Sequence, residues 1–371
     1  MALSKVDLAN QVENQLPQSL VADNVNFRNI LINGDMSIAQ RGTSFSSVSA
    51  GNGTYPVDRF RNNMGTAGTW TISQDTDVPS GQGFATSVKY DCTTANASLS
   101  AGSFLIFEQQ VEGQNLQYLK KGTANAESLT LSFWVKSNKT GTYIAELYDN
   151  DNTRQISQAY TISSASTWEK KTITYAGDTT GAFGNDNGAS LRLFLWLAAG
   201  SNYTSGTLNT SWNTTAVSNR VVGQVNLADD TANEWYITGV QLEAGTTASD
   251  FEFLPYDVNL ARCQRYYQLI AQGASSPINT GFAYSSSQVS AYITLITSMR
   301  ATPTLDMVSG TDYYRFTANA TNTNFNVLSL DIGNTRAVTV FKGSLSGLTG
   351  GQAGFINAIN ASSYIALASE L

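Results

Sequence analysis

The sequence predicts an all-β protein with two β-sandwich-like domains behind a short helical segment. Apolar and polar side chains alternate along many short runs, as where Leu129, Leu131 and Phe133 are separated by polar residues. Such period-two alternation is typical of antiparallel strands that bury one face. The runs are separated by connections rich in Gly, Asn and Asp, such as residues 184–188, and these residue types favour turns.

The composition supports this organisation. A chain of 371 residues exceeds one ordinary domain, so two domains and a short extra segment are expected. The hydrophobic fraction of 42% suffices for packed cores, whereas charged residues are only 13%, about half of the usual ~25%. The sequence has no fixed repeat of the kind that a β-helix or propeller shows. We therefore expect a neutral surface rich in hydroxyl and amide groups.

Several classes of function are disfavoured. A net charge of −7 without clusters of Lys and Arg argues against nucleic-acid binding. The absence of histidine removes the commonest general base and the usual catalytic triads. No apolar stretch is long enough for membrane insertion or a secretory signal. The two cysteines, Cys92 and Cys263, have no metal-binding spacing and are predicted to be free buried thiols.

Residues 1–26 are predicted to form a docking segment. Val6, Ala9, Val12 and Leu16 recur at helical spacing until Pro17 ends the pattern. So short a helix is marginal alone in water, which suggests that it docks on a partner. A frayed terminus is the alternative interpretation.

Residues 27–256 are predicted to form the first sandwich, with strands at 129–136, 191–197 and 235–243. In the last of these, Tyr236, Val240 and Leu242 are assigned to one face. Residues 257–371 are predicted to form a smaller β-rich domain, entered by a helical turn that passes into a strand at 257–267. Its last strand, 363–368, is apolar on both faces, so we expect it to be central in its sheet or buried against a neighbouring subunit.

Motifs along the chain also carry a resemblance to a known class of proteins. The run Asn33-Gly34-Asp35 follows an apolar run that is predicted to be a strand, and further motifs occur at 131–136 (LSFWVK), 237–245 (ITGVQLEAG), 251–255 (FEFLP), 261–267 (ARCQRYY) and 299–303 (MRATP). In this order they resemble carbohydrate-binding-module-like jelly rolls in appendage proteins of tailed bacteriophages. The start, residues 1–7, is similar to tail-fibre N-termini of marine podophages.

The resemblance implies a jelly-roll fold for residues 27–256 and a place in the virion. The expected protein is a non-enzymatic homotrimeric tail fibre that attaches through its N-terminal segment to phage tail or adaptor proteins. It would be assembled in the bacterial cytoplasm and would contribute to recognition of a host surface polysaccharide. The alternatives are a capsid or tail-hub decoration protein with a purely structural role and, less favoured, a glycan-hydrolysing tail spike.

Strand alternation yields a candidate glycan-binding surface. If the leucines at 191, 193 and 195 face the core, Arg192 and Trp196 face away from it. By the same argument Trp134 lies on an outer face, and Trp235, Gln241 and Glu243 are assigned to the same side of the last strand. Exposed tryptophan rings can stack on sugars, and charged groups can bind hydroxyls. The candidate residues are Trp134, Arg192, Trp196, Tyr203 and Trp212, and the alternative is that a neighbouring subunit covers these aromatics.

A structural calcium ion is also implied by the resemblance, because such jelly rolls often hold one between their first and last strands. The corresponding positions are Asp35 and Glu243. The sequence departs from the usual pattern at Met36 and at Thr238-Gly239, where those modules often carry acidic residues. The alternative is that Asp35 is only a turn residue.

No catalytic residue is predicted. Glycoside hydrolysis needs two carboxylates about 5–10 Å apart, and spacing alone offers Asp75 with Asp77 and Asp229 with Asp230. Both pairs lie in turn-like sequence, where aspartate is favoured without a catalytic role.

Overall fold

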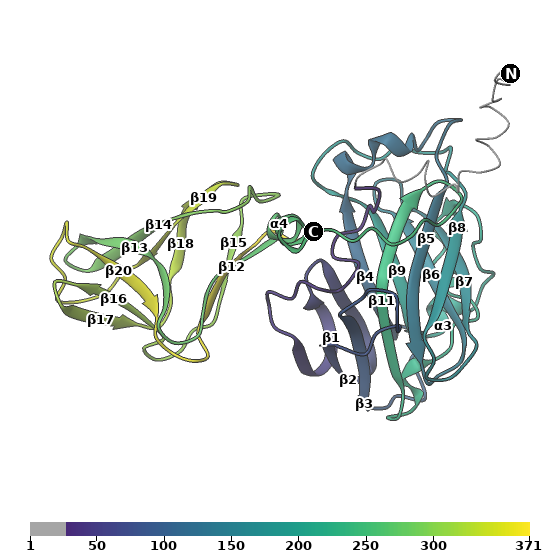
Figure 1. The fold of residues 1–371 in the computed structure, drawn as a ribbon, viewed down its shortest axis with the longest axis horizontal. Helices are drawn as coiled ribbons and strands as arrows, with labels where there is room; N and C mark the ends of the chain where they lie inside the picture. The colour runs from purple at the N-terminus through teal and green to yellow at the C-terminus, as the bar shows by residue number, and fades with distance from the viewer. Residues whose placement is uncertain (1–26) are drawn as a thin grey trace, which may run out of the picture. The chain divides into compact units, whose positions relative to one another are not determined.

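The computed structural model describes residues 27–371, so the predicted N-terminal docking segment lies outside the described residues. The described chain is nearly all β, which confirms the predicted fold class of a jelly-roll sandwich followed by a second β domain (Figure 1). It divides into two compact units. The first comprises 27–37, 46–52 and 62–254, and the second comprises 38–45, 53–61 and 255–371.

The first unit is built on one long antiparallel sheet in the order β10-β7-β6-β9-β4-β2-β3-β11-β5-β8, with β1 paired to β2. The strands are β1 (Ser44–Val57), β2 (Phe60–Asp75), β3 (Ser87–Thr94), β4 (Phe104–Glu112), β5 (Leu129–Ser137), β6 (Gly141–Asp149), β7 (Arg154–Ile162), β8 (Glu169–Tyr175), β9 (Ala189–Ala199), β10 (Asn213–Thr214) and β11 (Glu234–Ala244). The connections carry the short helices η1 (Gly113–Asn115), η2 (Gln117–Leu119), α3 (Ser201–Thr204), η3 (Val217–Asn219) and η4 (Leu227–Asp229).

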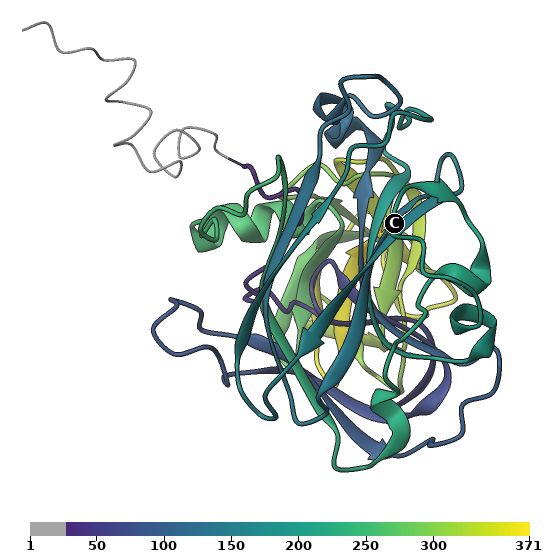
Figure 2. The same ribbon diagram turned by 90° about the vertical axis from the view of Figure 1, so that its right-hand side faces the viewer.

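Aromatic side chains fill the space between the two layers of this sheet. The Phe133 ring of β5 lies 5.1 Å from the Tyr160 ring of β7, although these strands are far apart in the sheet order. The sheet therefore closes on itself as a sandwich, and its long strands can be followed in Figure 2. Trp235 belongs to the same core, because its ring lies 5.8 Å from Tyr90 and 6.0 Å from Phe107.

The second unit begins with α4 (Tyr256–Gln264) and continues as two antiparallel sheets. A sheet in the order β12-β21-β15 contains β12 (Tyr267–Gln272), β15 (Thr304–Met307) and β21 (Tyr364–Ala368). A seven-stranded sheet in the order β17-β16-β20-β13-β14-β19-β18 contains β13 (Ser276–Ser285), β14 (Gln288–Thr294), β16 (Tyr314–Ala318), β17 (Thr321–Phe325), β18 (Ser329–Gly333), β19 (Ala337–Lys342) and β20 (Ala353–Ala358). The apolar strand β21 is central in its sheet, as predicted.

Residues 38–45 and 53–61 belong to the second unit, whereas the predicted boundary placed them in the range 27–256 of the first domain. A cluster of arginines and tyrosines explains this division. The guanidinium of Arg41 lies 3.6 Å from the ring centroid of Tyr267, and that of Arg59 lies 3.4 Å from Tyr266. Glu370 forms ion pairs with both arginines. Each arginine contacts both an aromatic ring and a carboxylate, so cation–π stacking and ion pairing together fix its position.

Asp58 lies in the same cluster and is almost fully buried. It accepts hydrogen bonds from the backbone and the side chain of Gln40, and Arg41 approaches it at 3.8 Å. Burial disfavours its charged form more than these contacts favour it, so its pKa rises to about 6.

The cysteines behave as predicted. Cys92 and Cys263 are free and buried, and they lie in different units. In the part of the chain that the structure describes, no helix has the length and apolar character needed to cross a membrane.

Candidate functional site

Three of the five predicted glycan-binding residues lie on or above one sheet face of the first unit. We call it the outer β6–β9 face, and it is formed by side chains of β4, β9, β6 and β7 that point away from the sandwich core. The strand register aligns them in three rows across the sheet. The rows are Gln110, Arg192, Tyr148 and Gln155; then Glu108, Phe194, Glu146 and Ser157; then Ile106, Trp196, Ile144 and Ala159.

The chain's own segment 200–226 covers part of this face. Tyr203, from α3, places its ring 5.4 Å from Trp196 and 6.0 Å from Phe104. Val221 packs on the same cluster, and Trp196 is 0% exposed. Trp196 does face away from the sandwich core, as the alternation predicts, but the expectation that its ring is available for stacking is wrong. Its cover is a loop of the same chain.

A buried ion pair lies at the centre of the covered region. Glu146 is fully buried and accepts hydrogen bonds from Arg220 Nε at 2.9 Å and from Arg220 Nη2 at 2.9 Å. The indole Nε1 of Trp196 donates to the same carboxylate at 2.8 Å. Burial raises the pKa of Glu146, and Arg220 opposes this rise. The Arg220 guanidinium also lies 4.9 Å from the Trp196 ring, so it fixes the covering segment to the sheet.

The first row remains partly accessible, and we call Gln110, Arg192, Tyr148 and Gln155 the open row. Tyr148 and Arg192 are half-buried, so both residues retain some exposure to solvent. Gln155, beside Tyr148, is 0% exposed, and within residues 27–371 neither its Nε2 nor its Oε1 has a hydrogen-bond partner. The Ser157 hydroxyl, two residues further along β7, is likewise buried without a partner in the described chain.

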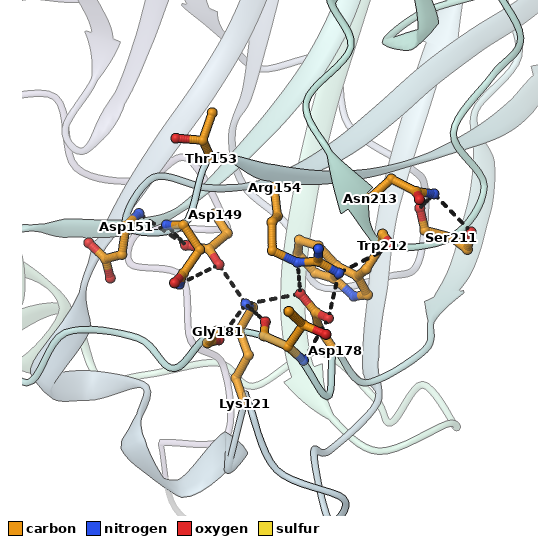
Figure 3. Close-up of polar contacts among 12 residues, drawn as sticks. Lys121, Asp149, Asp151, Thr153, Arg154, Asp178, Gly181, Ser211, Trp212 and Asn213 are labelled. Atoms are coloured by element: carbon orange, nitrogen blue, oxygen red, sulfur yellow. Dashed lines mark hydrogen bonds and ion pairs between the residues drawn. The ribbon is translucent and has the colours of Figure 1, made fainter.

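Trp212 lies beside this row but serves as an anchor. Its Nε1 donates to the Ala176 carbonyl at 2.8 Å, and the ammonium of Lys121 lies 5.4 Å from its ring (Figure 3). Lys121 is itself buried between Asp149, at 2.5 Å, and Asp178, at 3.0 Å. The structure thus places Trp212 in a packed cluster that holds segment 209–215 to the end of the sandwich.

Asp178 completes the cluster in Figure 3 by binding Arg154 through two hydrogen bonds of 2.7 and 2.9 Å. The paired cations hold the pKa of Asp178 below its ordinary value despite burial. Arg154 also donates to the Trp212 carbonyl at 3.2 Å. Because every charged group here is paired with another, the cluster is suited to fixing loop geometry beside Gln155.

Trp134 lies on the opposite side of the sandwich, on the outer face of β3, β11, β5 and β8, and is half-buried. On this face Lys136 pairs with Asp77 and lies 4.2 Å from the Tyr236 ring. Trp168 donates to the same Asp77 at 2.9 Å. Trp134 therefore does not share a surface with Arg192, Trp196 and Tyr203.

A β-bulge explains the wrong assignment of two side chains in β11. The register with β5 shifts between Thr238 and Gln241, and Gly239 has φ +64°. A side chain at Gly239 would meet Phe84 at 2.5 Å, so glycine is required on both grounds. The bulge reverses the alternation, which leaves Trp235 in the core and Tyr236 outside, whereas Gln241 lies on the predicted outer side.

The proposed calcium ligands do not form a site that fits the ion. Glu243 accepts hydrogen bonds from Ser249 N at 2.9 Å, Ser249 Oγ at 2.7 Å and Gln241 Nε2 at 2.9 Å, and Arg28 lies 4.0 Å away. The Glu243 carboxylate is thus already bound by hydrogen-bond donors, and the nearby guanidinium disfavours a further cation there. Among residues 27–371 there is no group of three or more His, Cys, Asp or Glu side chains placed to hold a metal.

The aspartate pairs considered for hydrolysis are engaged in turns and ion pairs. Asp75 accepts from the backbone of Asp77 at 2.8 Å, and Asp77 is held by Lys136 and Trp168. Asp229 accepts from Lys139 at 2.5 Å, and Asp230 accepts from the backbone of Ala232 at 2.9 Å.

Sequence reasoning missed Glu146, Gln155 and Arg220. A signal was present for Glu146, because it interrupts the apolar run 143–147 with a charged side chain, whereas Gln155 lies in a strand with several other polar residues and carried none. Arg220 carried no such signal, since its role depends on the path of a long loop.

Comparisons with known proteins give similarities of fold alone. No protein-family model matches the sequence, and no curated protein matches it. The solved structures that resemble it include the enzymatically active domain of tailspike protein 4 from bacteriophage CBA120, with 14% identity over 58% of this chain and a TM-score of 0.31. This match spans only 21% of the tailspike chain.

Two further similar structures contain carbohydrate-binding modules. The module TmCBM61 in complex with β-1,4-galactotriose shows 13% identity, a TM-score of 0.30, and coverage of 58% of this chain and 99% of that one. The Clostridium thermocellum xylanase 10B fragment with its CBM22-1 module, complexed with xylohexaose, shows 14% identity, a TM-score of 0.26, and coverage of 57% and 30%.

Proposed function

We propose that the first unit binds a glycan at the open row of the outer β6–β9 face. The observation that carries this proposal is the buried Gln155 amide, which has no hydrogen-bond partner in the described chain and lies beside the half-buried Tyr148 and Arg192. An unpaired buried polar group costs about 1–3 kcal/mol. Because Gln155 is 0% exposed, its side chain would have to turn toward solvent on binding, and a ligand that then supplies donors and acceptors would recover that cost.

The groups of a sugar are complementary to those of the open row. Its hydroxyls can both donate to and accept from the amides of Gln110 and Gln155, and its apolar ring face can stack on Tyr148. The guanidinium of Arg192 donates to oxygens and tolerates both neutral and acidic sugars. A small number of specifically placed polar groups around an aromatic surface is typical of small-ligand sites.

Binding without hydrolysis is part of the proposal. Glu146 and Glu108 occupy the same row of the face, but both are fully buried, and Glu146 is engaged by Arg220 and Trp196. A general acid or base must reach the glycosidic bond. Incubation with a bound polysaccharide is therefore expected to release no new reducing ends, and a steady release would contradict this point.

The binding experiment uses the full chain and gel retardation by soluble polysaccharides from the surface of candidate host bacteria. Tyr148→Ala and Arg192→Gln are expected to weaken retardation. Tyr118→Ala is the matched control, because Tyr118 is an exposed aromatic of the same unit outside the face. Unchanged retardation of both site variants, with native circular dichroism, would remove the open row from glycan binding.

We also propose that this unit is displayed on a phage particle, as part of a homotrimeric tail fibre that contacts the host. The support is the ordered set of appendage-like motifs and the predicted docking segment at 1–26. A capsid or tail-hub decoration protein with a structural role is the second candidate. Electron microscopy of the intact particle separates them, because contacts with a tail adaptor favour the fibre and lattice contacts with the major capsid protein favour decoration.

A further inference from the structure

The seven-stranded sheet of the second unit has one face that carries exposed aromatic rings. Its other face is buried in the core through residues such as Ala283, Val289 and Ile356. Alternation places the neighbouring residues outside, and four of these are large aromatics with high exposure. They are Phe282 (45%), Tyr284 (68%), Tyr292 (60%) and Phe355 (62%).

The register arranges two of these rings in a single row across five strands. Phe355 of β20 pairs with Thr280 of β13 and with Thr317 of β16. Tyr292 of β14 pairs with Thr339 of β19. The β13–β14 register, which pairs Gly281 with Ala291, puts Tyr292 opposite Thr280 when it is extended by one residue. We call the row of Thr317, Phe355, Thr280, Tyr292 and Thr339 the aromatic row.

The spacing in this row is set by the sheet. Phe355 and Tyr292 lie on the two strands that flank β13, so their backbones are about 10 Å apart, which is two strand spacings. The threonine hydroxyls lie between and outside the rings. Phe282 and Tyr284 extend the aromatic surface along β13, with ring centroids 6.5 Å apart.

The chemistry of the row identifies its occupant. No member of the row carries a charge, so the row is complementary to an uncharged ligand and offers no cation to an acidic one. Its apolar members are planar rings, not branched aliphatic side chains, and hydroxyls alternate with them. A second copy of the chain packed on this face would have to bury those hydroxyls against apolar rings, which is costly without hydrogen bonds.

We propose that the aromatic row is a second glycan-binding site, on the second unit, for a neutral polysaccharide. Two pyranose rings of one chain stack on Phe355 and Tyr292, and their hydroxyls bind the threonines of the row. The proposal does not depend on the open row, because it rests on residues of a different unit. A polysaccharide that engaged both sites would be held by two contacts at once, which strengthens binding through effective concentration.

The test uses the full-length Tyr148→Ala protein, which removes the open row, and measures gel retardation by soluble galactomannan, xylan and mixed-linkage β-glucan. At least one of these neutral polysaccharides is expected to retard the protein, and the anionic polysaccharide alginate is not. Phe355→Leu and Tyr292→Leu keep an apolar side chain but lose the planar ring, so each is expected to weaken binding about tenfold. Phe355→Tyr keeps the ring and is expected to bind like the parent.

A matched control is Tyr256→Ala, since Tyr256 is 65% exposed but lies in α4, outside the row. Sedimentation velocity is run on the same proteins. No retardation by any neutral polysaccharide, or equal retardation of the leucine variants and the parent, would overturn the proposal. Self-association that the leucine variants weaken, together with absent polysaccharide binding, would assign the face to a second copy and also overturn it.

Discussion

Replacing Gln155 with leucine tests whether its buried amide serves to bind a ligand or only contributes to packing. The side chain is 0% exposed, and both its amide atoms lack partners within the described residues, so leucine of similar length removes two buried polar atoms without breaking a hydrogen bond. Relief of such an unpaired group is worth about 1–3 kcal/mol. For a unit of this size each kcal/mol corresponds to about 2–4 °C in Tm. We therefore expect Gln155→Leu to be more stable than the parent and to bind glycan less well.

The assay can isolate the first unit. All six tryptophans lie in it, at positions 70, 134, 168, 196, 212 and 235. Urea unfolding followed by tryptophan fluorescence therefore reports on this unit alone. Gln158→Leu is the control, because the Gln158 amide donates to the Thr210 carbonyl at 3.1 Å and its loss should not stabilise the unit. A Gln155→Leu protein that is less stable than the parent would refute the reasoning, since it would show that the amide is satisfied.

Three further predictions concern other buried groups. Arg220→Met leaves Glu146 buried without its cation and should lower the free energy of unfolding by about 3–5 kcal/mol. Because burial raises the pKa of Glu146, this loss should grow as pH increases and shrink in acid, as urea titrations at several pH values can show. The folded pKa of Asp58, about 6, exceeds its ordinary value of 3.8, so Asp58 stabilises the fold below pH 4 and this contribution is lost as pH rises through 6. Carboxyl ¹³C NMR should show a titration midpoint near 6 for Asp58, and a higher midpoint in Arg41→Gln. A midpoint at the ordinary value would contradict the burial argument. Trp212→Ala should leave glycan retardation unchanged but increase amide hydrogen exchange in residues 209–215, and unchanged exchange would show that Trp212 does not hold this segment.

The fold class was predictable because strand alternation is local. The pattern in β9, with leucines inward and Arg192 and Trp196 outward, depends only on the two-residue period of a strand. The same rule failed in β11, where one extra residue at the bulge reversed the phase and moved Trp235 into the core. A single glycine with a positive φ was enough to invalidate the inference for the residues before it.

The site was only partly predictable because its accessibility depends on a long connection. The sequence indicates which side chains leave the sandwich core, but it does not indicate that segment 200–226 returns over the sheet and covers Trp196. Likewise, Trp134 and Trp196 look equivalent by alternation, and only the sheet order places them on opposite outer faces. Long-range loop paths are not encoded in short periodic patterns.

Because the second unit is formed by separate segments of the sequence, it cannot be excised as one continuous fragment. A cassette that starts at residue 255 would carry Tyr266, Tyr267 and Glu370 but would leave behind Arg41 and Arg59, which stack on those tyrosines and neutralise that carboxylate. Exchange of this unit between related proteins by recombination would therefore have to transfer residues 38–61 along with it. Recombinants joined near residue 254 should fold only when the parent that supplies residues 38–61 carries arginines that match the tyrosines and the carboxylate supplied by the other parent.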